Sequence, residues 1–161
     1  MTTENTPVEN PSSGGIQENV KATGQLSVVL RDENGEIKDE RSIPNLVVTV
    51  GKNWISSRMK TTGIPNEMSH MAIGSGTATP VVGDSTMGTE LGRVALTSSV
   101  VTSATIEYIA TFTAGTGTGA VTEAGIFNNS SAGTMLCHTA FSVVNKGASD
   151  SLTITWDVTI S

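Results

Sequence analysis

Few side chains in this sequence are of the kinds that perform chemistry. The only histidines are His70 and His138, the only cysteine is Cys137, and Glu123 stands alone in a stretch with almost no other charge. A cysteine beside a histidine could form a thiolate–imidazole pair or supply metal ligands. Neighbouring residues on a strand point to opposite faces, however. We therefore expect Cys137 to be a buried, inert thiol and His138 to point outward among polar residues.

The other charged residues in weakly charged segments predict structural roles. Two histidines without clustered carboxylates make a poor zinc site and a poor catalytic triad. We accordingly expect no catalytic residue, no metal and no cofactor. Glu90 and Arg93 are three residues apart and predict an ion pair, either local or between subunits. Glu123 precedes the segment 124–127, where its carboxylate could accept hydrogen bonds from turn amides.

Two glycine-rich segments, 74–76 and 115–119, could in principle cradle a phosphate. Neither ends in the Gly-Lys-Ser/Thr of a phosphate-binding loop, and Thr79 stands where a dinucleotide-binding motif needs its third glycine. Both segments therefore predict ordinary loops. The net charge of −6 provides no basic field for nucleic acid, so we expect no nucleic-acid partner and no small-molecule substrate.

The composition predicts an all-β protein that must position these side chains. Serine and threonine make up 42 of the 161 residues and glycine adds 17, whereas charged residues are only 15%. Threonine favours strands, and glycine and serine favour turns. No apolar run approaches the length of a membrane span, the N-terminus lacks the features of a secretion signal, and one cysteine cannot form an internal disulfide. We expect folding in a reducing cytoplasm and no membrane partner.

Alternation of apolar and polar residues predicts eight or nine antiparallel strands. The clearest is 151–160, where every second residue from Leu152 to Ile160 is apolar. Asn34-Gly35 predicts a hairpin turn, and 51–60 is the best helix candidate. We also expect one helical turn within 84–93 and strands over 45–50 and 94–102. This pattern favours an antiparallel β-sandwich or jelly-roll-like domain over residues 24–161, with one short helix.

Residues 1–23 form a separate, polar segment before this domain. Such a segment is either a disordered tail or an extended arm that orders against a partner, and we expect the arm. More than half of the fifteen acidic residues precede residue 41, so the part of the domain from Pro44 on is nearly neutral. The arm residues expected to bind a partner are Pro7, Val8, Pro11, Ile16 and Val20.

The order of several segments resembles that of small β-rich structural proteins of tailed-bacteriophage virions. The resemblance covers about residues 45–161 and excludes the arm. It is carried by Leu46-Val47-Val48-Thr49-Val50-Gly51-Lys52, by Met68 to Gly76, by Gly83 to Val94, by Thr122-Glu123-Ala124-Gly125-Ile126-Phe127, by Gly133 to Phe141 and by Leu152 to Trp156.

The resemblance implies a non-enzymatic virion protein and carries over no catalytic residue. We expect a capsid decoration or cement protein, a homotrimer whose partners are the major capsid protein and copies of itself. The alternatives are a tail, neck or fibre component and, third, a glycan-binding module. Because the near-neutral domain offers little repulsion between copies, its composition is compatible with packing among neighbouring subunits.

Overall fold

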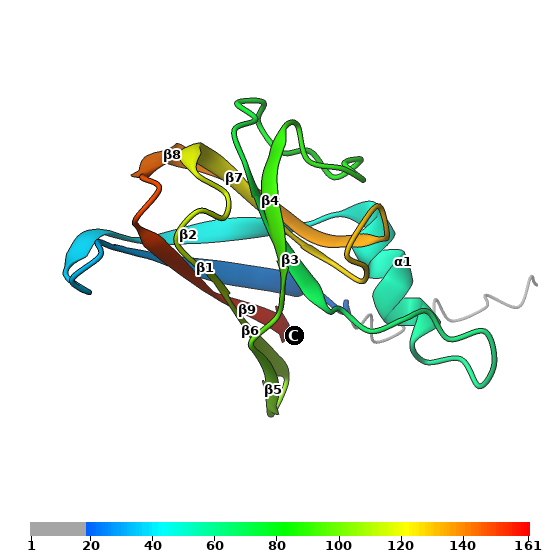
Figure 1. Ribbon diagram of the computed structural model, residues 1–161. Coiled ribbons are helices and arrows are strands. Elements are labelled where there is room, and N and C mark those ends of the chain that lie inside the picture. Colours follow the sequence, from blue (N-terminus) through cyan, green and yellow to red (C-terminus); the bar gives the residue numbers. More distant parts are fainter. Residues whose placement is uncertain (1–18) are drawn as a thin grey trace, which may run out of the picture.

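The computed structural model describes residues 19–161, and within this range the chain forms nine antiparallel strands and one short helix (Figure 1). The expected all-β, antiparallel architecture with a single short helix is confirmed. The elements are β1 (Ala22–Arg31), β2 (Ile37–Val47), α1 (Thr49–Ser57), β3 (His70–Gly74), β4 (Glu90–Ala95), β5 (Ser98–Thr102), β6 (Thr105–Phe112), β7 (Gly119–Phe127), β8 (Met135–Lys146) and β9 (Ser151–Ile160).

The strands form one curled sheet in the order β4-β3-β7-β8-β2-β1-β9-β6-β5. Strand β2 belongs to both halves of this sheet. Most of it pairs with β1, but its last residues, Leu46 and Val47, pair with His138 and Cys137 of β8. The curled sheet therefore folds into a sandwich-like arrangement whose two halves share one core, and β4 and β5 are left as its edge strands.

The shared core is built from the alternating residues of the central strands. Leu152, Ile154, Trp156 and Val158 of β9 are all buried, as the alternation in this segment predicts. They pack with apolar residues of β1 and β6 from the same half and of β3, β7 and β8 from the other. Burial of these side chains is the main stabilising contribution to such a fold.

Three local expectations were wrong, each because tertiary contacts overrode a local pattern. The strand expected over 45–50 ends at Val47, and α1 follows from Thr49, since the Val48 and Thr49 amides bond to the carbonyls of Leu136 and Val82. Segment 84–93 contains no helical turn; residues 84–89 lie in a loop, and residues 90–93 belong to β4. The single strand expected over 94–102 is divided between β4 and β5.

The loop 75–89 between β3 and β4 covers the outer face of the β3–β7–β8 half of the sheet. A second apolar cluster forms there, with Val48, Ala72, Phe127 and Met135 buried and Met87 of the loop packed against them. This is why successive residues of β7, which alternate between the two faces, are all buried from Glu123 to Phe127. The loop makes a third layer, which the sequence pattern did not indicate.

The chain enters the fold next to its C-terminus. Lys21 and Ser161 exchange backbone hydrogen bonds of 2.6 and 2.9 Å, and β1 starts at Ala22, two residues before the expected domain boundary at 24. Of the expected arm residues, Pro7, Val8, Pro11 and Ile16 lie outside the described residues. Within residues 19–161, no helix is long and apolar enough to cross a membrane.

Candidate functional site

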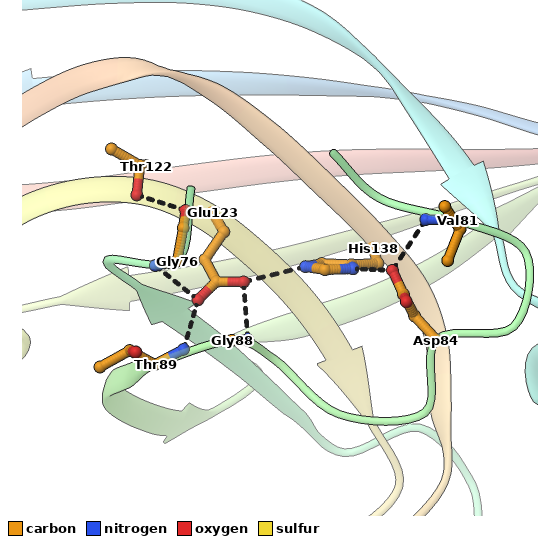
Figure 2. A network of polar contacts seen from close by, with 8 residues as sticks. All are labelled: Gly76, Val81, Asp84, Gly88, Thr89, Thr122, Glu123 and His138. Carbon is orange, nitrogen blue, oxygen red and sulfur yellow. Dashed lines mark hydrogen bonds and ion pairs between the residues drawn. The ribbon is translucent and has the colours of Figure 1, made fainter. Parts of the chain in front are cut away.

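A buried cluster of three ionisable side chains joins the loop 75–89 to the sheet (Figure 2). His138 of β8 lies between two carboxylates, with Nδ1 2.8 Å from Oδ2 of Asp84 and Nε2 3.0 Å from Oε2 of Glu123. Glu123 comes from β7, and Asp84 comes from the loop. Only 2% of Glu123 and 5% of His138 is exposed. We call these three residues the carboxylate–imidazole cluster.

The loop backbone surrounds the Glu123 carboxylate. Oε1 accepts hydrogen bonds from the amides of Gly76 and Thr89, each at 2.8 Å, and Oε2 accepts one from Gly88 at 3.0 Å (Figure 2). A Cβ at Gly76 would lie 2.4 Å from Oε1, so only glycine allows this approach. The glycine-rich segment thus does bind an anion, which is the side chain of Glu123. Glu123 accepts backbone amides as expected, but they come from the loop 75–89 and not from a turn at 124–127, which belongs to β7.

The hydrogen bonds of the cluster lower the pKa values of its two carboxyl groups. Burial acts to raise the pKa of Glu123, but the amides of Thr89 and Gly88, His138 and the amide of Gly76 outweigh it, so the pKa lies below its usual range. For Asp84, burial is likewise opposed and outweighed by the Val81 amide and His138, so its pKa is also lowered. Ionised carboxylates only accept hydrogen bonds. Each carboxylate is therefore the acceptor in its contact with His138.

This geometry corrects the expectation that His138 points outward into solvent. His138 does leave β8 on the face opposite the main core, but the loop 75–89 covers that face. Cys137, on the other face, is buried as expected, and burial raises the pKa of its thiol. His70 lies apart from the cluster on β3, where its Nδ1 is 2.8 Å from Ser69 Oγ. The sequence analysis did not single out Asp84, because it lies far along the chain from both partners.

The cluster is arranged to hold the loop in place. Both imidazole nitrogens and both Glu123 oxygens are occupied by partners within the protein, and 23% of the Asp84 side chain is exposed. Among residues 19–161, no group of three or more His, Cys, Asp or Glu side chains is arranged so that it could hold a metal ion. A cavity of about 400 Å³ adjoins the cluster, lined by loop residues such as Ser75, Thr77 and Thr86. The interactions described here anchor one wall of that cavity.

The expected ion pair between Glu90 and Arg93 is confirmed as a contact within one chain. Arg93 Nη2 is 2.7 Å from Glu90 Oε2, and Nε is 3.0 Å from Oε1. Residues three apart on a regular strand face opposite sides, but here the pairing with β3 shifts, so that Ile73 faces Gly92 and Gly74 faces Glu90. The extra residue between them is a β-bulge, and it returns both side chains to one side.

Arg93 also secures the loop that follows β7. Its Nη1 donates to the carbonyls of Asn129 and Ala132, at 3.0 and 2.8 Å, and its guanidinium carbon lies 3.7 Å from the centroid of the Phe127 ring. The side chain is only 8% exposed. Arg93 therefore holds the turn 128–133 through charge-assisted bonds and a cation–π contact.

An apolar groove of about 830 Å³ lies between α1 and the β5–β6–β9 end of the sheet. Its helical wall carries Trp54, Ile55 and Arg58. The sheet side contributes Ile106, Val158 and Ile160, and edge strand β5 contributes Val101. We call this the apolar groove. Its size and lining are those of ligand or peptide sites.

Comparisons of the chain with protein-family models, with curated proteins and with solved structures find no match.

Proposed function

We propose that this protein is a non-enzymatic structural component of a tailed-bacteriophage virion, with capsid decoration as its role. The proposal starts from the resemblance of residues 45–161 to β-rich virion proteins. The structural observation that supports it most is that the carboxylate–imidazole cluster bonds to the loop 75–89. Both ring nitrogens of His138 and both oxygens of Glu123 take part in anchoring the loop 75–89, which supports an architectural role for this cluster.

An uncovered sheet edge supports contacts with other subunits. Strand β5 pairs with β6 only, so its other side presents unpaired backbone groups. Val100 and Val101, neighbours on this strand, are 53% and 67% exposed, and no residue of β5 is charged. Proteins usually protect an edge with charges, proline or a covering segment. An apolar, uncharged edge fits a chain whose partners are the major capsid protein and copies of itself, as in the proposed homotrimer.

The N-terminal arm is the second part of the proposal. In this role Pro7, Val8, Pro11, Ile16 and Val20 would contact neighbouring capsid subunits. Val20, the one member within the described residues, is 83% exposed and therefore accessible. An arm of this kind adds buried area across a subunit joint and raises overall avidity without new chemistry.

The placement is tested by locating the protein on particles. Antibodies against the purified chain, followed by immunogold microscopy and quantitative mass spectrometry of purified virions, should find many copies spread over the shell. Label confined to the tail with few copies would replace capsid decoration with the tail, neck or fibre alternative. If the protein is not detected in purified virions, the proposed virion role is overturned. Binding to a glycan array would favour the glycan-binding alternative.

The stabilising role is tested by adding the protein back. Capsids that lack it should lose resistance to heat, and full-length protein should restore that resistance. A variant with V100E should bind the capsid less well if the β5 edge makes the contact. A matched variant with an equal charge change on an exposed position away from β5, I37E, should bind as the wild type does. Equal binding by both variants would exclude the β5 edge from the interface.

A further inference from the structure

The apolar groove is open to solvent in the part of the molecule that the structure describes. Its floor consists of side chains from three different strands, among them Ile106, Leu136 and Val158. The groove presents apolar side chains beside polar ones, and concave surfaces of this size are common binding sites in proteins.

The N-terminal segment leaves the fold beside this groove. Val20 and Lys21 line a cavity together with Ile55 of α1 and Ile160 of β9. The same two residues, Ile55 and Ile160, line the apolar groove. Eighteen further residues precede residue 19, and an extended chain of that length reaches up to about 60 Å. The segment is therefore tethered at the groove and has ample length to enter it.

Residues 1–18 also complement the apolar groove and its adjoining cavity in charge and side-chain type. Residues 1–18 contain three acidic residues, Glu4, Glu9 and Glu18, and no lysine or arginine. Arg58 lines the groove, and Lys21 and Lys52 line the adjoining cavity; Glu67 is the one acidic residue in either lining. The segment's larger aliphatic side chains, Val8 and Ile16, supply the apolar groups that such a groove buries.

We propose that, in the free protein, residues 1–18 of the same chain occupy the apolar groove, with Val8 and Ile16 as apolar anchors. The tether gives the segment a high effective concentration at the groove, on the order of millimolar, so weak apolar contacts suffice. This inference concerns the free protein and does not depend on a virion role. If the arm also binds capsid subunits, the segment must leave the groove to do so.

Trp54 provides the readout. This residue lines the groove, with its indole Nε1 donating to the carbonyl of Asn66 at 2.8 Å, whereas Trp156, the other tryptophan, is fully buried in the core. Quenching of fluorescence by acrylamide therefore reports on Trp54. In the full-length protein, the double variant V8E/I16E should raise the quenching constant about twofold, because the indole loses its apolar cover. The matched variant T6E/S12E adds the same charge at polar positions and should behave as the wild type does.

A second pair of variants tests the groove itself. Val101 lines the groove and Val100, its neighbour on β5, does not. Both are exposed, so neither substitution removes a core contact. V101E should raise quenching of Trp54 as V8E/I16E does, and V100E should leave it unchanged. Addition of a synthetic peptide of residues 1–18 to the V8E/I16E protein should restore low quenching, whereas the peptide with both glutamates should not.

The other possible results either overturn the proposal or identify another occupant of the groove. Equal quenching in the wild type and V8E/I16E overturns the proposal. Quenching that falls as protein concentration rises, together with a dimer or trimer mass by light scattering, assigns the groove to a second copy instead. A small apolar molecule retained in native mass spectra of every variant assigns it to a ligand. Wild-type shielding that is independent of concentration, in a monomer, supports the intramolecular arrangement. Failure of the capsid experiments would leave these readouts unaffected.

Discussion

Glu123 and His138 lie on adjacent strands as diagonal neighbours, and a hydrogen bond of 3.0 Å joins them beneath a loop. In the β7–β8 pairing Glu123 faces Ala140, and His138 faces Gly125. Side chains at such diagonal positions are within reach of each other when they are long. Alanine and glycine at the facing positions leave room for this contact. The loop 75–89 then completes the cluster with three backbone amides and Asp84, which makes the cluster the attachment point of the third layer.

Loss of the Glu123 charge should destabilise the protein strongly. E123Q replaces one acceptor oxygen by an NH₂ group, which cannot accept the amides that now point at it. We expect the free energy of unfolding in urea to fall by about 3–5 kcal/mol, the usual cost of breaking a buried charge pair. E40Q, at an exposed position on β2, is the control and should change stability by about 0.5 kcal/mol or less. Similar values for both variants would contradict the anchoring role.

Gly76 should tolerate no side chain, unlike another glycine of the same loop. In G76A the new Cβ would lie 2.4 Å from Oε1 of Glu123. At Gly83 a Cβ would meet no atom within 4 Å. G76A should therefore lower the free energy of unfolding by about 1–3 kcal/mol, as crowding of a packed site does. G83A should be neutral or slightly stabilising. Thermal unfolding of the two proteins side by side measures the difference.

The cluster should make stability depend on acid pH. The pKa values of Glu123 and Asp84 are lowered in the folded protein, so the unfolded chain binds protons at higher pH than the folded one. Their contribution is therefore present above about pH 5 and is lost as the pH falls through the folded pKa values. Urea titrations between about pH 7 and pH 3, a range that spans the ordinary pKa values of carboxyl groups, should show this decline in the free energy of unfolding. D84N should make the decline shallower; an identical slope would argue against the cluster as its source.

Arg93 should be irreplaceable by lysine. Its guanidinium bonds to both Glu90 oxygens and to two carbonyls of the turn 128–133, and a lysine ammonium cannot reproduce this planar set of donors. R93K should cost about 1–3 kcal/mol of stability and speed amide hydrogen exchange in the turn. R31K, at an exposed arginine that bonds to one carbonyl, is the control. Unchanged exchange in the turn would contradict the role of Arg93.

The sequence by itself determined the architecture and several of the contacts. Alternation in 151–160 was enough to identify the buried face of β9, because strand periodicity is local. The Glu90–Arg93 pair was also predictable, since both charges stand close together in a weakly charged segment. That Glu123 accepts backbone amides was predictable as well, but their source in the loop 75–89 was not. The buried state of Cys137 followed from the same alternation of faces.

Only the tertiary structure decided which faces are covered. Local periodicity shows that His138 and Cys137 point to opposite sides, but it cannot show that a loop fifty residues earlier in the chain covers the polar side. The same holds for Asp84, which meets His138 only because the loop 75–89 folds back over β7 and β8, and for the apolar groove, whose walls come from α1, β5 and β9. Contacts between distant segments depend on the packing of the whole chain, and no short stretch of sequence encodes them.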